Sequence, residues 1–159
     1  MGKIIIHTDG AAQGNPGRGG YGIVMQSGSH YKELSEGFKL TTNNRMELLS
    51  VIVALERIKI ENAQVEVYSD SKYVVDAVEK GWVFSWEKKN FKGKKNVDLW
   101  KRFLPIYRKH NVKFFWVKGH AGNQFNERCD QLAVEAANSR DLQEDTGYVQ
   151  SIKKDEGLF

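Results

Sequence analysis

Four acidic residues stand where a folded chain could bring carboxylates together. Asp9 and Asp70 each end a short segment typical of a buried strand, and neither TDG nor SDS around them contains a cation. Glu47 heads a long apolar segment, and Asp130 lies one turn into the last helical segment. Clustered carboxylates repel one another, and oxygen-bound divalent cations, Mg²⁺ above all, would compensate that repulsion. Two such ions roughly 4 Å apart can stabilise both the attacking and the leaving oxygen when a phosphodiester is cleaved by in-line displacement at phosphorus.

Glu47 is the least ordinary of these acids. The segment after it is apolar on most sides, which is typical of a buried helix. On a period of about 3.6 residues, Glu47 lies over Val51, Ala54 and Ile58. A charge at the head of a buried stripe is unfavourable unless an arginine, a hydrogen-bond network or a metal ion compensates it. The residues alone leave these three open.

Each acid also has an ordinary interpretation. An Asp-Gly pair such as Asp9-Gly10 is most often a turn, and Asp70 before Ser71 is most often a helix cap. Asp130 could be a solvated helix residue. Spacing alone therefore leaves both a metal site and a set of local caps open.

Hydrophobic periodicity predicts the elements that must position the acids, in the order expected of an α/β fold with a mixed sheet covered by helices. The expected strands are Lys3–Asp9, Tyr21–Gln26, Tyr31–Phe38, Gln64–Ser69 and Val112–Val117. The expected helices are Asn43–Ile58, Ser71–Lys80, Asn96–Lys109 and Phe125–Asn138, and glycine-rich residues 10–20 are expected to form a loop. If the strands before Asp9 and Asp70 are parallel neighbours, both carboxylates emerge at one edge of the sheet.

Composition narrows the class of protein. A chain of 159 residues, 40% hydrophobic and 28% charged, suits one globular domain. No apolar run approaches the roughly 18 residues of a membrane span, so no membrane partner is expected. Cys129 is the single cysteine, which excludes an internal disulfide and favours the cytoplasm. The net charge of +4 permits a polyanionic partner.

Ordered motifs give the chain a family resemblance. The motif TDGAAQGNPGRGGYG (Thr8–Gly22) is similar to the opening motif of bacterial type 1 ribonuclease H. The further blocks that resemble this family are TTNNRMELL (Thr41–Leu49), YSDS (Tyr68–Ser71), NVDLW (Asn96–Trp100), WVKGHAGNQFNERCD (Trp116–Asp130) and EDTGY (Glu144–Tyr148). The resemblance runs from Lys3 to about Tyr148. We expect a catalytic domain over residues 1–148 and a flexible tail over residues 149–159.

The resemblance implies a ribonuclease H-like fold with a five-stranded mixed sheet flanked by helices. It implies endonucleolytic hydrolysis of the RNA strand of RNA–DNA hybrids with two Mg²⁺ or Mn²⁺ ions, leaving a 5′-phosphate and a 3′-hydroxyl. The matching positions place Asp9, Glu47, Asp70 and Asp130 at the family's metal-binding carboxylates, and His120 at its catalytic histidine. We expect the protein to be a monomer.

The resemblance also implies substrate contacts. Asn15, Asn43 and Asn44 match minor-groove contacts to the hybrid, and Thr42 matches a residue that holds a DNA-strand phosphate. Their ordinary interpretation is turn and helix-cap chemistry.

Segment 81–95 resembles the family's basic protrusion, with Lys88 and Lys89 expected on phosphates and Trp82 beside the DNA sugar-phosphate path. For Trp86 we prefer a position in the core. Lys72 departs from the glutamine of many relatives, which would exchange a base or ribose contact for a phosphate contact.

Two other classes of protein compete with this interpretation. A non-catalytic hybrid-binding module on the same fold would be marked by the loss of carboxylates, whereas all four are present. A retroviral or integrase-like nuclease acting on DNA is disfavoured by the intact protrusion at residues 81–95.

Overall fold

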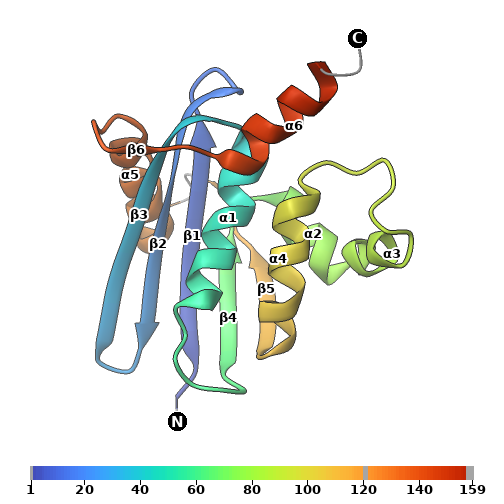
Figure 1. Cartoon of the computed structure of the whole chain (residues 1–159). Coiled ribbons are helices and arrows are strands. Elements are labelled where there is room, and N and C mark those ends of the chain that lie inside the picture. Colours follow the sequence, from blue (N-terminus) through green and yellow to red (C-terminus); the bar gives the residue numbers. More distant parts are fainter. Residues whose placement is uncertain (1, 120–121, 157–159) are drawn as a thin grey trace.

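The computed structural model describes residues 2–119 and 122–156, with a six-stranded mixed sheet between layers of helices (Figure 1). The strands are β1 (Ile4–Ala12), β2 (Gly17–Ser27), β3 (His30–Thr41), β4 (Gln64–Ser69), β5 (Asn111–Trp116) and β6 (Leu142–Gln143). The helices are α1 (Asn43–Glu56), α2 (Lys72–Glu79), α3 (Trp82–Lys88), α4 (Val97–Arg108), α5 (Gln124–Ala137) and α6 (Thr146–Glu156).

The sheet has the strand order β5-β4-β1-β2-β3-β6. The β1–β2 and β2–β3 pairs are antiparallel, while β1–β4 and β4–β5 are parallel. The prediction of a mixed sheet is confirmed, and so is the parallel pairing of the strands that lead to Asp9 and Asp70. The count of five strands was one short, because the two-residue β6 pairs with Gly37 and Phe38 of β3 and has no strand pattern of its own.

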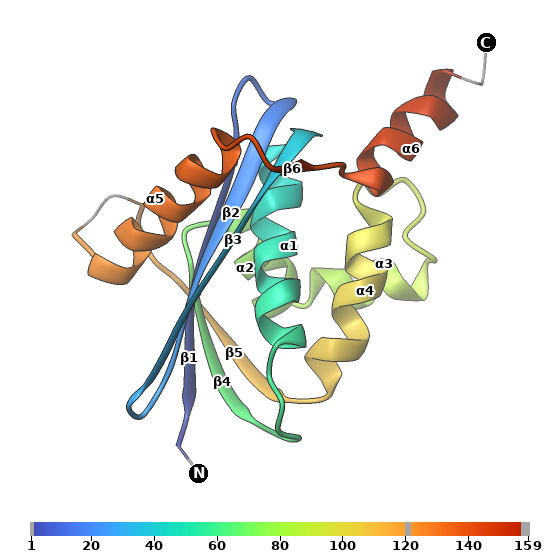
Figure 2. The same ribbon diagram turned by 60° about the vertical axis from the view of Figure 1, so that its left-hand side comes forward.

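The helices cover the two faces of the sheet unequally. Figure 2 shows α5 on one side of the sheet and α1 with α4 on the other. Helix α1 lies in the middle of the larger core and buries ten of its residues, which confirms the prediction of a buried helix. Thr42 caps it by accepting a hydrogen bond from the backbone N–H of Arg45.

The glycine-rich loop predicted over residues 10–20 is mostly strand. Strand β1 continues to Ala12, and β2 begins at Gly17. Several of these glycines serve packing, because β2 lies directly under α5. At Gly22, a Cβ atom would overlap the backbone of Cys129 on that helix. A glycine-rich pattern indicates a close approach of backbones as readily as a loop.

The polar segment after residue 148 continues α6 as far as Glu156. The sequence predicts a flexible tail from residue 149, and the described part of that tail is helical. Its flexibility in solution stays a prediction. None of the helices in the described ranges has the length and hydropathy required to cross a membrane.

Candidate active site

Three carboxylates meet at one edge of the sheet. Thr8 of β1 and Ser69 of β4 are direct neighbours in the parallel register, so the next residues, Asp9 and Asp70, emerge side by side. Glu47 reaches the same place from the first turns of α1. One oxygen from each of Asp9, Glu47 and Asp70 lies within 4.8 Å of the others. The tertiary structure therefore assembles three of the four carboxylates predicted to bind metal.

Gly10 makes this approach possible. A Cβ atom at Gly10 would overlap the backbone of Met46 and Glu47, so a larger residue would push α1 away from β1. The Gly10 N–H donates to Asp9 Oδ1 at 2.9 Å and to Glu47 Oε1 at 3.2 Å. One backbone donor thus serves both acids, and the buried Glu47 Oε2 has no hydrogen-bond partner among the described residues.

The carboxylates are in an unfavourable environment without a cation. Burial and the charge of Asp70 raise the pKa of Asp9 to about 7, and the charge of Asp130 adds to this. Burial, together with Asp9 and Asp70, holds the pKa of Glu47 well above its ordinary value. The site fits a hard divalent cation such as Mg²⁺ or Mn²⁺, because its potential ligands are all oxygens, its three carboxylates lie close together, and the buried Glu47 Oε2 has no hydrogen-bond partner among the described residues.

We expect the metal-free protein to gain stability as the pH falls through the raised pKa of Asp9. The native state then binds a proton that the unfolded chain, with a pKa near 3.8, does not bind, so the free energy of unfolding rises from about pH 8 to about pH 5. Thermal unfolding at several pH values in a chelator measures this pH dependence. Asp9→Asn is the control, because it removes the carboxyl group whose protonation causes the change in stability. Equal pH profiles for the two proteins would contradict it.

Arg45 is not the counter-ion of Glu47, although it lies two residues away. Its buried guanidinium forms paired hydrogen bonds with Asp145, at 2.7 and 2.9 Å, and with Asp98, at 2.8 and 2.7 Å. Thr41 Oγ1 also donates to Asp145 at 2.7 Å. Sequence reasoning missed this network. The only available signal was that Asp98 and Asp145 lie in the motifs NVDLW and EDTGY, to which no role was given.

The remaining residues predicted for catalysis are placed differently. Asp130 lies on α5, outside the group of three, although its negative charge contributes to the raised pKa of Asp9. His120 lies outside the described residues, so its role stays a prediction.

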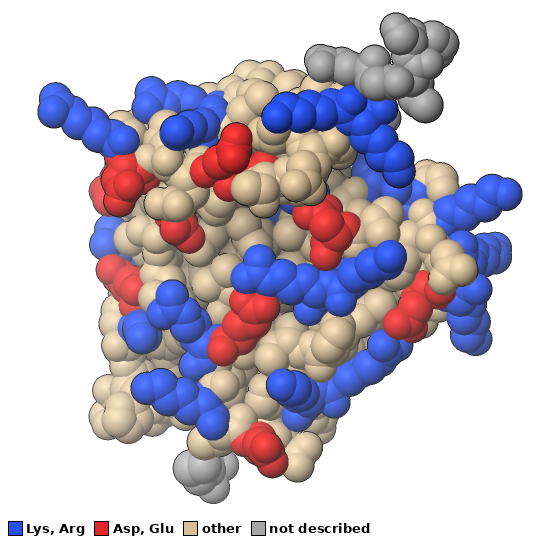
Figure 3. Space-filling model, in the orientation of Figure 1, with Lys and Arg blue, Asp and Glu red and all other residues tan. Residues whose placement is uncertain are grey.

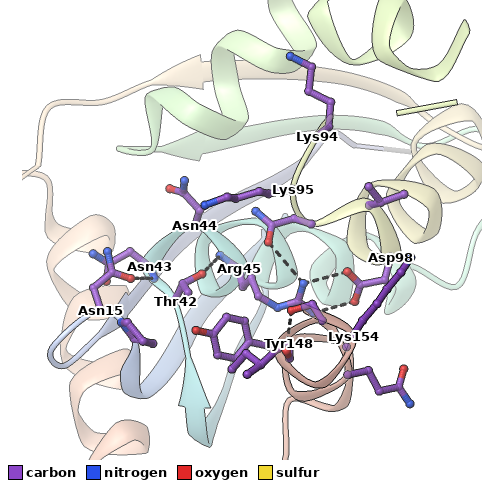
Figure 4. Close-up of a pocket in the computed structure, with 17 residues that line it drawn as sticks. Asn15, Thr42, Asn43, Asn44, Arg45, Lys94, Lys95, Asp98, Tyr148 and Lys154 are labelled. Carbon is purple, nitrogen blue, oxygen red and sulfur yellow. Dashed lines mark hydrogen bonds and ion pairs between the residues drawn. The ribbon is translucent and has the colours of Figure 1, made fainter. Parts of the chain in front are cut away.

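A groove of about 890 Å³ lies beside the start of α1 (Figure 4). Asn15, Thr42, Asn43 and Asn44 line it, and Lys94 and Lys95 line another side. Asn15 Oδ1 accepts from the backbone N–H of Asn43 at 3.0 Å, and Asn43 Oδ1 accepts from Ala12. The ordinary cap and turn chemistry is therefore present. It orients these side chains at the groove without excluding substrate contacts.

The lysines expected on phosphates are exposed at or near α3. Lys88 ends α3 and Lys89 follows it, and Figure 3 shows cations gathered along this right-hand edge of the molecule. Trp82 is 46% exposed and lies under the Lys80 ammonium, with its ring centroid 5.2 Å away. Trp86 instead packs edge-on against Trp100, as expected of a core residue.

Lys72 lies on another edge, close to the carboxylates. Its Nζ atom is 4.7 Å from the ring centroid of Trp116, whose indole N–H donates to the main-chain oxygen of Asp70 at 3.1 Å. Lys72 is therefore held beside the acidic group.

Comparison with known proteins agrees with this geometry. The profile of the RNase H family matches residues 1–138. The chain is 54% identical over 151 residues to the Ribonuclease H of Trichodesmium erythraeum (strain IMS101), covering 92% of this chain and 96% of that protein. The crystal structure of LC9-RNase H1, a type 1 RNase H with the type 2 active-site motif, is similar with a TM-score of 0.78 and 31% identity, over 86% of this chain and 72% of that one. The crystal structure of LC11-RNase H1 in complex with RNA/DNA hybrid is similar with a TM-score of 0.60 and 28% identity, over 86% of this chain and 97% of that one.

Proposed function

The chain belongs to the RNase H family and is an enzyme of that family, and from this premise we propose that it hydrolyses the RNA strand of RNA–DNA hybrids with two divalent cations. The observation that carries the proposal is the convergence of Asp9, Glu47 and Asp70 within 4.8 Å. Such a group is self-repelling without metal and lies near the groove that Asn15, Thr42, Asn43 and Asn44 line.

Asp9, Glu47, Asp70 and Asp130 would hold the cations, which we propose to be Mg²⁺ or Mn²⁺. Two ions there would supply an activated water and stabilise the leaving oxygen, giving a 5′-phosphate and a 3′-hydroxyl. The Gly10 N–H holds Asp9 and Glu47 in place through its shared hydrogen bond. His120 is proposed to act in proton transfer or product release.

Recognition of the hybrid is proposed to use two surfaces. The amides of Asn15, Asn43 and Asn44 can donate and accept hydrogen bonds, as the 2′-hydroxyl and base edges of a minor groove require. Thr42, Lys72, Lys88 and Lys89 would contact phosphates, and Trp82 would lie against a sugar-phosphate path. The similarity to a relative solved with an RNA/DNA hybrid supports this assignment.

The test is cleavage of one labelled hybrid in Mg²⁺, beside single-stranded RNA and duplex DNA of the same sequence. We expect cleavage of the RNA strand of the hybrid alone, because the amide contacts select a 2′-hydroxyl and the groove selects a duplex. Equal cleavage of duplex DNA would contradict the proposal. Binding of the hybrid without cleavage would favour the alternative, a non-catalytic hybrid-binding module, which the complete set of four carboxylates disfavours.

Neutralising the protrusion should make hybrid binding less sensitive to salt. For Lys88→Gln with Lys89→Gln, we expect the slope of log affinity against log salt to flatten by about one unit for each phosphate that the protein no longer neutralises. The matched control is Lys59→Gln with Lys109→Gln, since these lysines line a separate pocket between the end of α1 and the end of α4. An equal change of slope in the control would remove the protrusion from the binding surface.

A catalytic domain over residues 1–148, a monomeric state and a cytoplasmic location stay predictions. Gel filtration with light scattering tests the second of these directly.

A further inference from the structure

A row of stacked rings crosses the sheet directly below the carboxylates. His7 of β1 pairs with Tyr68 of β4, and Tyr68 pairs with Phe115 of β5. The His7 and Tyr68 rings are 5.0 Å apart and 15° from parallel, and the Tyr68 and Phe115 rings are 5.1 Å apart and 18° from parallel. At the inner end, Phe125 of α5 lies 5.1 Å from His7. His7, Tyr68 and Phe115 form one continuous stack, and the Phe125 ring is tilted by 40° against its inner end. We call these four rings the aromatic row.

The aromatic row is buried at one end and open at the other. Helix α5 packs on β1, β2 and β3, whereas β5 is the edge strand of the sheet (Figure 2). His7 is buried, but Phe115 is 39% exposed. Within the described part of the chain, Tyr68 is the only ring in contact with Phe115. The outer end of the stack can therefore accept one more flat ring from solvent.

The aromatic row runs toward the acidic group along the face of β1 that carries Asp9, whereas Glu47 enters that group from α1 on the opposite side of the sheet. His7 precedes Asp9 by two residues, and Tyr68 precedes Asp70 by two. Residues two apart on a strand point to the same face and are about 7 Å apart. A nucleic-acid strand that leaves the carboxylates can thus reach Phe115 within about one nucleotide step.

The surroundings of the open end favour a polyanion. Lys113 is exposed and lies two residues before Phe115 on the same face of β5, and Lys118, just beyond the end of β5, is also exposed. The acid on this face of β4, Glu66, is already paired with Lys3 at 2.9 Å. Cations beside an open aromatic stack are the combination used to bind single-stranded nucleic acid, because every base has a π-face.

We propose that Phe115 stacks an unpaired base of the RNA strand where that strand extends beyond the hybrid. The RNA strand is the favoured occupant because it is the strand that the carboxylates would act on. The inference rests on the proposed function and adds a preference for hybrids with overhanging RNA. Stacking of one base should raise affinity about fivefold or more.

The experiment measures equilibrium binding in a chelator, where cleavage does not occur, at one fixed salt concentration. Three hybrids share one duplex: blunt, with RNA overhanging at both ends, and with DNA overhanging at both ends. The proteins are the unchanged chain, Phe115→Leu, Phe115→Trp and Tyr31→Leu. Phe115→Trp keeps a stacking ring, and Tyr31 is an exposed aromatic on β3, which is distant in the strand order.

We expect the RNA overhang to raise affinity about fivefold in the unchanged chain, in Phe115→Trp and in Tyr31→Leu, and less than about twofold in Phe115→Leu. An equal gain from the DNA overhang, or a gain that persists in Phe115→Leu, would overturn the inference. A lower unfolding temperature of Phe115→Leu with the gain intact would make the aromatic row purely structural. Failure to bind or cleave the blunt hybrid would instead reject the proposed function, and the inference with it.

Discussion

Asp9→Asn is expected to lower the rate of hybrid cleavage in Mg²⁺ by at least about 100-fold, the usual result of removing one preorganised charge that stabilises a transition state. The physical reason is that Asp9 is buried between Glu47 and Asp70, where its carboxylate would complete the oxygen ligands of a cation. Single-turnover cleavage of a labelled hybrid measures the effect. Asp141→Asn, at an exposed position, is the matched control. Cleavage that persists in Asp9→Asn would remove Asp9 from the metal site.

The same variant carries a second readout that separates impaired chemistry from impaired folding. Without metal, Asp9 adds a charge to a group whose members already repel one another. Asp9→Asn should therefore unfold at a higher temperature than the unchanged chain in a chelator near neutral pH. An inactive variant that unfolds at a lower temperature would indicate structural damage.

Arg45→Ala is expected to lower the free energy of unfolding by about 3 kcal/mol or more, because removing one partner leaves buried charge uncompensated. Asp145 is 7% exposed and depends on the Arg45 guanidinium for two hydrogen bonds. Urea unfolding at neutral pH measures the decrease. Arg102→Ala is the matched control, since its bidentate pair with Glu56 is exposed and should contribute less than about 1 kcal/mol.

A double replacement shows whether the destabilisation comes from unpaired charge. Arg45→Met with Asp145→Asn should be less destabilised than Arg45→Ala alone, because the double variant has no buried carboxylate at position 145 that lacks its arginine partner. Equal destabilisation by Arg45→Ala and Arg102→Ala would mean that the buried network contributes little. The network also ties Thr41, just before the groove-lining Thr42, to Asp145 ahead of α6.

The secondary structure followed from the sequence wherever local patterns were strong. The β4 strand has the predicted bounds, and α1 begins at the predicted Asn43 under its Thr42 cap. The prediction of a loop over residues 10–20 was wrong. Glycine is common in loops, where its backbone is free, and also in strands that lie close to a helix, where no side chain fits, and the sequence pattern is the same in both cases. Strand β6 could not be predicted, because a strand of two residues is too short to show an alternation of apolar and polar side chains.

The sequence by itself determined the chemistry of this protein: which carboxylates are available, a strand that ends just before Asp70, and a helix that must bury Glu47. The predicted strand end at Asp9 was wrong, because β1 continues to Ala12. Only the tertiary structure decided which partners each charge has. Arg45, two residues from Glu47 along the chain, pairs with Asp98 and Asp145, and Glu47 meets Asp9 and Asp70 instead. The physical reason is that α1 can approach β1 closely only over Gly10, which points Glu47 to the sheet edge and Arg45 to α4. Charge pairing over such distances in sequence depends on packing, which no local pattern encodes.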